Sequence, residues 1–185
     1  MFARKKTENA QVLSVMKAKH HRYEALVKAF HTDIYRYAFW LVKDQSVAED
    51  IVQETFLRAW RSLDALNDEK AAKSWLITIL RRENARRFER KQLETVDIDD
   101  VSIQDETQQA DDDVSNRELQ RLLGGLSIEY REPLILQIIF GFSGEEIADQ
   151  LGLNKNTVMT RLFRARNQLK EALEKQNEQR GRANG

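Results

Sequence analysis

A long acidic stretch near the middle of the chain separates two regions that carry charges of both signs. Between Gln92 and Asn116 there are nine acidic residues and no lysine or arginine. Repulsion among these carboxylates opposes compaction, and the apolar residues show no helical spacing, so we expect an extended, flexible linker. It is either a solvated tether or a segment that lies in a positively charged channel of a partner. The predicted parts are a basic extension (1–19), a first module (20–92), the acidic linker (93–115), a second module (116–175) and a polar tail (176–185).

Both modules are predicted to be helical. The 185 residues include only 7 glycines and 1 proline, too few for an all-β fold with many tight turns. We therefore predict an all-α protein of two small helical domains joined by the flexible acidic linker. Disorder is the expectation for the basic residues 1–19, and fraying for the polar tail. The chain has no run of about 18 apolar residues and no signal-peptide stretch, so we expect a soluble, cytosolic protein.

The first module begins with two apolar segments at helical spacing. One runs from Tyr23 to Phe30, and the other, apolar nearly all round, runs from Ile34 to Val42. Asp33 stands at the junction, where a carboxylate favours a helix start. The pattern predicts two consecutive helices, the second of them central to the core.

The third predicted helix, over Val47–Ser62, has two different faces. Val52, Phe56 and Ala59 group on the side expected to be buried. Asp50, Gln53, Glu54 and Leu57 lie on the opposite side. A solvated face explains the polar residues, whereas an exposed leucine among them indicates a docking surface.

The fourth predicted helix begins near Lys73 with an apolar segment and becomes strongly basic at its end. Six arginines and lysines and one aromatic residue, Phe88, occur between positions 81 and 91. That composition suits a surface that follows a nucleic-acid backbone and stacks on bases. The alternative is a helix end whose cations favour the helix dipole and pair with neighbouring acids.

The second module contains a segment typical of a helix-turn-helix. Ala148 is small where two helices cross, Gly152 accepts the positive φ of the turn, and Asn154 suits the N-cap of the second helix. Apolar residues between Ile147 and Leu162 supply the buried side, although a plain helical hairpin is an alternative. Upstream, Leu119–Leu126 predicts a helix, and Pro133 predicts a helix start or a kink. The candidate groove-facing residues are Lys155, Asn156, Thr157, Met159, Thr160, Arg161 and Arg164.

Nothing in the chain indicates catalysis. There is no cysteine, the three histidines lack metal-ligand spacing, and no phosphate-binding glycine loop occurs. We expect neither an enzyme nor a bound cofactor or metal.

Four motifs in order carry a family resemblance: DIVQETFLRAW (50–60), KSWLITI (73–79), FSGEEIA (142–148) and TVMTRLFRAR (157–166). With the acidic linker between the second and third, the chain resembles an extracytoplasmic-function (ECF, group 4) sigma factor of bacterial RNA polymerase over about residues 22–174. The resemblance implies two sigma domains, called two and four. It also implies binding to core polymerase, promoter-specific transcription initiation and inhibition by an anti-sigma factor, which is often membrane-bound. No insertion of this chain into a membrane is expected.

The resemblance also implies roles for particular residues. Asp50, Gln53, Glu54 and Leu57 would dock on the clamp helices of the largest polymerase subunit. The helix that begins at Asn154 would read the −35 element. The loop Leu63–Ala72 and the basic helix would engage the −10 element, including a base rotated out of the stack. The −10 candidates are Lys73, Trp75, Arg81, Arg82, Asn84, Arg86 and Arg87.

The chain departs from the family's pattern in both DNA-binding segments. Leu80 and Arg82 stand where relatives often have alanine and asparagine, and the nearest amide is Asn84. Asn156 stands where relatives usually have a small residue, and Met159 stands where they often have a basic one.

A neutral chain with one helix-turn-helix is expected to bind duplex DNA weakly until polymerase fixes the spacing of its modules. The competing classes are a dimeric helix-turn-helix regulator and a module that binds only proteins.

Overall fold

The computed structural model describes residues 2–94 and 121–183, and every regular element in those ranges is a helix. The chain divides into two compact units, one of residues 1–35 and 49–98 and the other of residues 36–48 and 99–185. Most of the predicted acidic linker, together with Leu119, lies outside the described residues. None of the described helices is long and apolar enough to cross a membrane.

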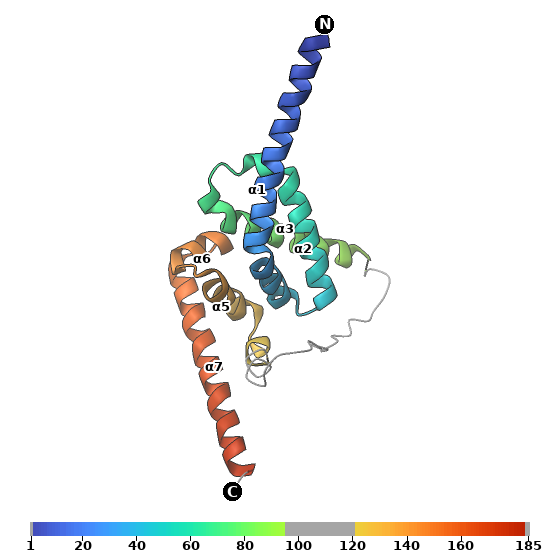
Figure 1. Cartoon of the computed structure of the whole chain (residues 1–185). Coiled ribbons are helices and arrows are strands. Elements are labelled where there is room, and N and C mark those ends of the chain that lie inside the picture. The colour runs from blue at the N-terminus through green and yellow to red at the C-terminus, as the bar shows by residue number, and fades with distance from the viewer. Residues whose placement is uncertain (1, 95–120, 184–185) are drawn as a thin grey trace. The chain divides into compact units, whose positions relative to one another are not determined.

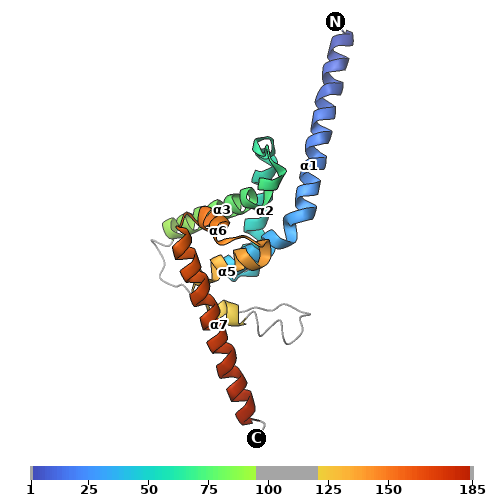
Figure 2. The same cartoon turned by 90° about the vertical axis from the view of Figure 1, so that its left-hand side faces the viewer.

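The first helix, α1 (Phe2–Val42), is continuous over 41 residues. The prediction of two helices separated near Asp33 was wrong, as was the expectation of disorder before residue 20. No glycine or proline interrupts this segment, so a carboxylate alone does not end the helix. In Figures 1 and 2 the N-terminal part of α1 extends beyond α2 (Gln45–Arg61) and α3 (Ala72–Glu94).

The helices of the first unit pack through the predicted apolar faces. Val52, Phe56 and Ala59 of α2 are buried, as expected. Between α2 and α3 the chain forms two short 3-10 turns, η1 (Leu63–Ala65) and η2 (Glu69–Ala71). Leu63 and Leu66 anchor this loop in the core, which also contains Leu26, Ile34, Leu76, Ile77 and Leu80.

The second unit contains α5 (Ile128–Phe140), α6 (Gly144–Leu151) and α7 (Lys155–Ala183). Residues 121–125 are also helical. Pro133 lies inside α5 and not at its first residue. The tail expected to fray continues α7 as far as Ala183, and this part of the helix extends beyond α5 and α6 in both views (Figures 1 and 2).

The turn between α6 and α7 has the geometry that the sequence predicts. Gly152 takes a positive φ of 66°, which costs a residue with a Cβ more than it costs glycine. The side chain of Asn154 accepts a hydrogen bond of 2.8 Å from the backbone N–H of Thr157. Ile147, Val158 and Leu162 are fully buried between the helices. The helix-turn-helix interpretation is therefore supported over a plain hairpin.

Helix α6 begins with a reciprocal cap that the sequence analysis missed. The Ser143 hydroxyl accepts from the N–H of Glu146, and the Glu146 carboxylate accepts from the N–H of Ser143. The Ser-x-x-Glu spacing is a known signal for this cap.

Candidate nucleic-acid interface

The start of α7 lines a shallow hollow of about 680 Å³ on the second unit. Tyr130 and Glu129, from the first turn of α5, form its other wall. The first turn of a recognition helix is the part that approaches base edges in a major groove. Of the seven predicted −35 residues, the hollow brings together six: Lys155, Asn156, Thr157, Thr160, Arg161 and Arg164.

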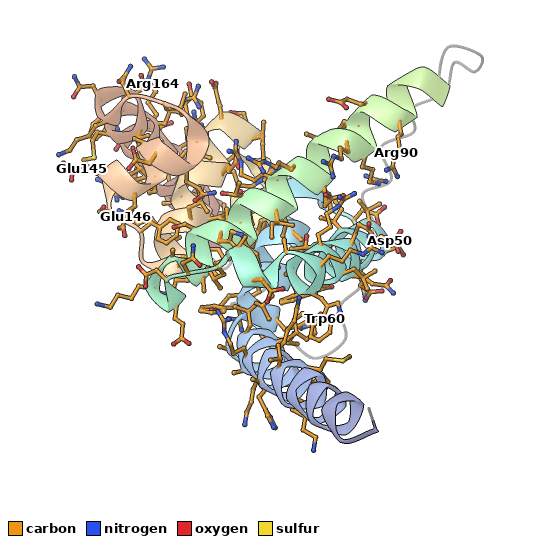
Figure 3. All side chains as sticks on the ribbon, turned by 90° about the horizontal axis from the view of Figure 1, so that it is seen from above. Asp50, Trp60, Arg90, Glu145, Glu146 and Arg164 are labelled. Atoms are coloured by element: carbon orange, nitrogen blue, oxygen red, sulfur yellow. The ribbon has the colours of Figure 1, made fainter. Side chains whose placement is uncertain are left out.

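Acidic side chains from neighbouring helices pair with two cations of this surface. Lys155 Nζ lies 2.5 Å from a carboxylate oxygen of Glu145, and Arg161 lies 3.7 Å from Glu129. The hydrogen bond from Lys155, and then its charge, lowers the pKa of Glu145 below its ordinary value. Figure 3 shows Glu145 and Arg164 at the outer surface of this unit. Lys155 is exposed and Arg161 is half-buried, and a local ion pair orients each side chain.

Met159 is not part of this hollow. Its Sδ atom would lie 3.0 Å from a Cβ added to Gly144, so the thioether packs closely over the first residue of α6. About half of the side chain remains exposed. Gly144 thus provides the space that brings α6 and the Met159 side chain together.

The predicted polymerase-docking residues lie on α2, where Asp50, Gln53 and Leu57 are exposed and Glu54 is half-buried. Leu57 and Gln53 border an apolar groove of about 550 Å³ between α1 and α2. Asp50, Gln53 and Glu54 also line a second hollow, of about 350 Å³, whose other side is formed by α3.

In the second hollow, the acidic residues Asp50 and Glu54 of α2 lie next to the basic end of α3. Arg86, Arg87 and Arg90 line it from α3; Asp50 and Arg90 are labelled in Figure 3. Residues of α2 that are expected to bind polymerase and residues of α3 that are expected to bind the −10 element therefore border one concave surface.

A buried carboxylate at the base of this hollow was not predicted. Glu83 of α3 is only 6% exposed. It forms an ion pair with Nε of Arg58 from α2, and it accepts a 2.8 Å hydrogen bond from Arg86. The sequence signal was an acid within a run of arginines, three residues before Arg86, a spacing that brings helical side chains together. Glu83 joins α2 to α3 beneath the proposed binding surfaces.

The remaining −10 candidates spread along α3 and do not converge on one point. Lys73 and Arg82 are exposed, whereas Trp75, Arg81 and Asn84 are partly buried. The side-chain oxygen of Asn84 is buried and has no hydrogen-bond partner within the described part of the chain.

The loop between α2 and α3 makes two polar contacts with α1. Lys19 Nζ lies 2.6 Å from Oδ2 of Asp64, and the guanidinium of Arg22 donates a 2.9 Å hydrogen bond to the carbonyl oxygen of Leu66. The loop and α1 together line a mainly apolar hollow of about 480 Å³. Sequence reasoning missed these contacts because their partners are 45 and 44 residues apart.

No group of three or more His, Cys, Asp or Glu side chains suitable for a metal ion occurs among the described residues. The hollow at the start of α7 instead presents cations, amides and hydroxyl groups, which are the groups that contact phosphates and base edges.

Comparison with known proteins shows which family this chain resembles. Residues 26–94 match sigma-70 region 2, and residues 116–169 match sigma-70 region 4. RNA polymerase sigma factor SigV of Bacillus subtilis is 38% identical over 133 residues, covering 72% of this chain and 80% of SigV. ECF RNA polymerase sigma factor SigL of Mycobacterium tuberculosis (strain H37Rv) is 34% identical over 152 residues, covering 76% of this chain and 85% of SigL.

Solved structures of two proteins are also similar to this chain. The sigma factor RpoE of Bartonella quintana, in complex with the anti-sigma factor NepR, aligns with a TM-score of 0.71 and 30% identity over 85% of this chain and 98% of RpoE. CnrH, in complex with the cytosolic domain of CnrY, aligns with a TM-score of 0.60 and 26% identity over 84% of this chain and 89% of CnrH.

The chain therefore belongs to the sigma-70 family of RNA polymerase sigma factors, and within it to the ECF sigma factors. Proteins of this class confer promoter specificity on transcription initiation and are not enzymes. The resemblance inferred from the four motifs is confirmed.

Proposed function

We propose that this sigma factor docks on core RNA polymerase through Asp50, Gln53, Glu54 and Leu57. In this proposal, residues 20–92 form domain two, which engages the −10 element through Lys73, Trp75, Arg81, Arg82, Asn84, Arg86 and Arg87. Residues 116–175 form domain four, and the seven candidate residues of α7 read the −35 element. The protein acts in the cytoplasm, together with the polymerase.

The observation that carries the −35 assignment is the hollow at the start of α7. Six candidates of suitable chemistry line it, on a helix whose N-terminus is ordered by Asn154 and by the positive φ of Gly152. Arginine, asparagine and threonine match the donors, acceptors and methyl groups that bases present in the major groove.

Run-off transcription with bacterial core polymerase on a promoter library tests the function directly. The wild-type chain should select templates that share two elements at a fixed spacing. Arg164→Ala should reduce initiation at selected promoters about tenfold, because one base or phosphate contact carries on the order of 1–3 kcal/mol. Lys175→Ala, which removes an exposed charge farther along α7, should have little effect. A folded chain that programmes initiation on no template contradicts the proposal.

Docking through α2 has its own test. Leu57 is 42% exposed at the edge of an apolar groove, so Leu57→Asp should weaken binding to core polymerase without lowering the thermal stability of the chain. A matched change at an exposed, uncharged position in the first turn of the same helix, Ser46→Asp, adds the same single negative charge and serves as the control. Equal losses for both variants would exclude a specific role for Leu57.

Regulation by an anti-sigma factor is the second part of the proposal. Its support is the likeness to RpoE and CnrH, each solved with such an inhibitor or partner domain. We propose that the inhibitor, which is membrane-bound in many systems of this kind, covers the polymerase-facing groove beside Leu57. Capture of core polymerase by the free protein but not by its complex with the inhibitor would support this. A stable symmetric dimer that never binds polymerase would instead indicate a conventional helix-turn-helix regulator.

A further inference from the structure

The N-terminal part of α1 contacts the loop Leu63–Ala72, which the family resemblance assigns, together with α3, to the −10 element. Lys19 and Arg22 lie before residue 26, where the match to sigma-70 region 2 begins. Their side chains nevertheless bind two residues of the loop, Asp64 and Leu66. The contacts therefore join a segment outside the matched family region to a proposed DNA-binding element inside it.

Two groups lie close to the ammonium group of Lys19, the carboxylate of Asp64 and the ring of Trp60. This ammonium group lies 2.6 Å from Oδ2 of Asp64 and 5.4 Å from the centre of the Trp60 ring. Tyr23 packs edge-on against the same ring at 5.1 Å, and its hydroxyl group donates to the carbonyl oxygen of Phe56. The Lys19 side chain is only 23% exposed, so it is ordered among these groups, in contrast to a freely solvated lysine. Trp60, labelled in Figure 3, lies beside α1.

The Arg22 contact fixes the backbone at the end of η1. Leu66 follows this turn in an extended conformation, with φ −82° and ψ 91°. A carbonyl at a helix end lacks a partner within the helix, and the Arg22 guanidinium supplies one at 2.9 Å. The side chain of Leu66 is buried at the same time. Arg22 therefore holds the point at which the loop changes direction, while Lys19 holds the preceding turn.

We propose that Lys19 and Arg22 are positioning residues for promoter opening, which hold the loop Leu63–Ala72 in the conformation that captures the unpaired −10 strand. This inference rests on the proposed function, because it assigns no new ligand to the loop. It adds Lys19 and Arg22 of α1 to the residues on which capture of the −10 strand depends. Neither side chain needs to contact DNA for this role, since each acts through a residue of the loop.

The experiment uses the full-length protein assembled with core polymerase. Three quantities are measured: affinity for core, affinity of the holoenzyme for a −35 duplex, and its affinity for a fluorescent single-stranded oligonucleotide that carries the selected −10 sequence. The test variant combines Lys19→Ala with Arg22→Ala. The control combines Lys17→Ala with Lys28→Ala, which removes the same charge from exposed positions of α1.

The test variant should bind the single-stranded −10 oligonucleotide about tenfold more weakly, since one charge-assisted hydrogen bond and one ion pair are lost. Its affinities for core and for the −35 duplex should stay within about twofold of wild type. Restoring the charges as Lys19→Arg with Arg22→Lys should recover part of the loss. A test variant that matches its control in all three measurements overturns the proposal.

A change on the loop side tests the same contact without altering α1. Asp64→Asn removes the partner of Lys19 at a side chain that is 74% exposed, so the fold should be preserved. If Lys19 acts through Asp64, Asp64→Asn and Lys19→Ala should weaken oligonucleotide binding to a similar extent, and their combination should weaken it no further. Fully additive effects would refute this route. Failure of the wild-type holoenzyme to bind the oligonucleotide would instead reject the proposed function itself.

Discussion

Glu83 is the residue whose replacement tests the packing of the first unit most directly. Its carboxylate is 6% exposed and pairs with Arg58 of α2 and Arg86 of α3. Glu83→Gln keeps the size and one acceptor oxygen but removes the charge that both guanidinium groups face. Loss of one partner from a fully buried ion pair costs about 3–5 kcal/mol.

The expected cost at Glu83 is smaller than that range. The side chains of Arg58 and Arg86 are 35% and 46% exposed, so water compensates part of their lost pairing. We therefore expect a loss of about 2 kcal/mol in the free energy of unfolding, which corresponds to a fall in Tm of about 10 °C for a unit of this size.

Tryptophan fluorescence during thermal unfolding measures this effect in the full-length chain. Trp60 and Trp75 belong to the first unit and Trp40 to the second, so all variants are compared in a Trp40→Phe background. Glu89→Gln removes an exposed carboxylate from the same helix and should shift Tm by no more than about 2 °C. Equal shifts for the two variants would show that the buried pairing of Glu83 contributes nothing beyond surface charge.

Three further changes test local features of the fold. Gly152→Ala should destabilise the second unit by about 1 kcal/mol, because alanine is disfavoured at a φ of 66°; chemical denaturation followed by circular dichroism measures it. Ser143→Ala should cost about 1 kcal/mol in the same assay through loss of the reciprocal cap with Glu146. Tyr23→Phe should cost about 1 kcal/mol through loss of the hydrogen bond to the Phe56 carbonyl. Burial raises the pKa of Tyr23 above its ordinary value of 10.0; the associated stability is complete below pH 10.0 and is lost as pH rises above it. Denaturation at pH 9 and pH 11 should therefore show a smaller alkaline loss in Tyr23→Phe than in wild type, and an unchanged loss would exclude this explanation.

Local sequence patterns predicted much of the fold. The spacing of apolar residues placed α2 and α3 close to their observed bounds, and Ala148, Gly152 and Asn154 together predicted the turn of the helix-turn-helix. These signals are reliable because helix periodicity, a positive φ and an N-cap each depend on residues within a few positions of one another.

The same reasoning was wrong about α1. It treated Asp33 as the start of a new helix, although α1 continues through it and no glycine or proline occurs between residues 2 and 42. A favourable residue for a helix start does not end the preceding helix unless the backbone is also interrupted, for example by glycine or proline.

The sequence by itself determined the helical class, the separation of two family regions and the residue types offered to polymerase and promoter. Only the tertiary structure decided which of those residues meet: Glu83 between Arg58 and Arg86, and Lys19 and Arg22 against the loop that follows α2. Helix periodicity is set by neighbours along the chain, whereas an ion pair between helices depends on how they pack and turn relative to one another. That packing is a property of the whole core, so no local pattern specifies it.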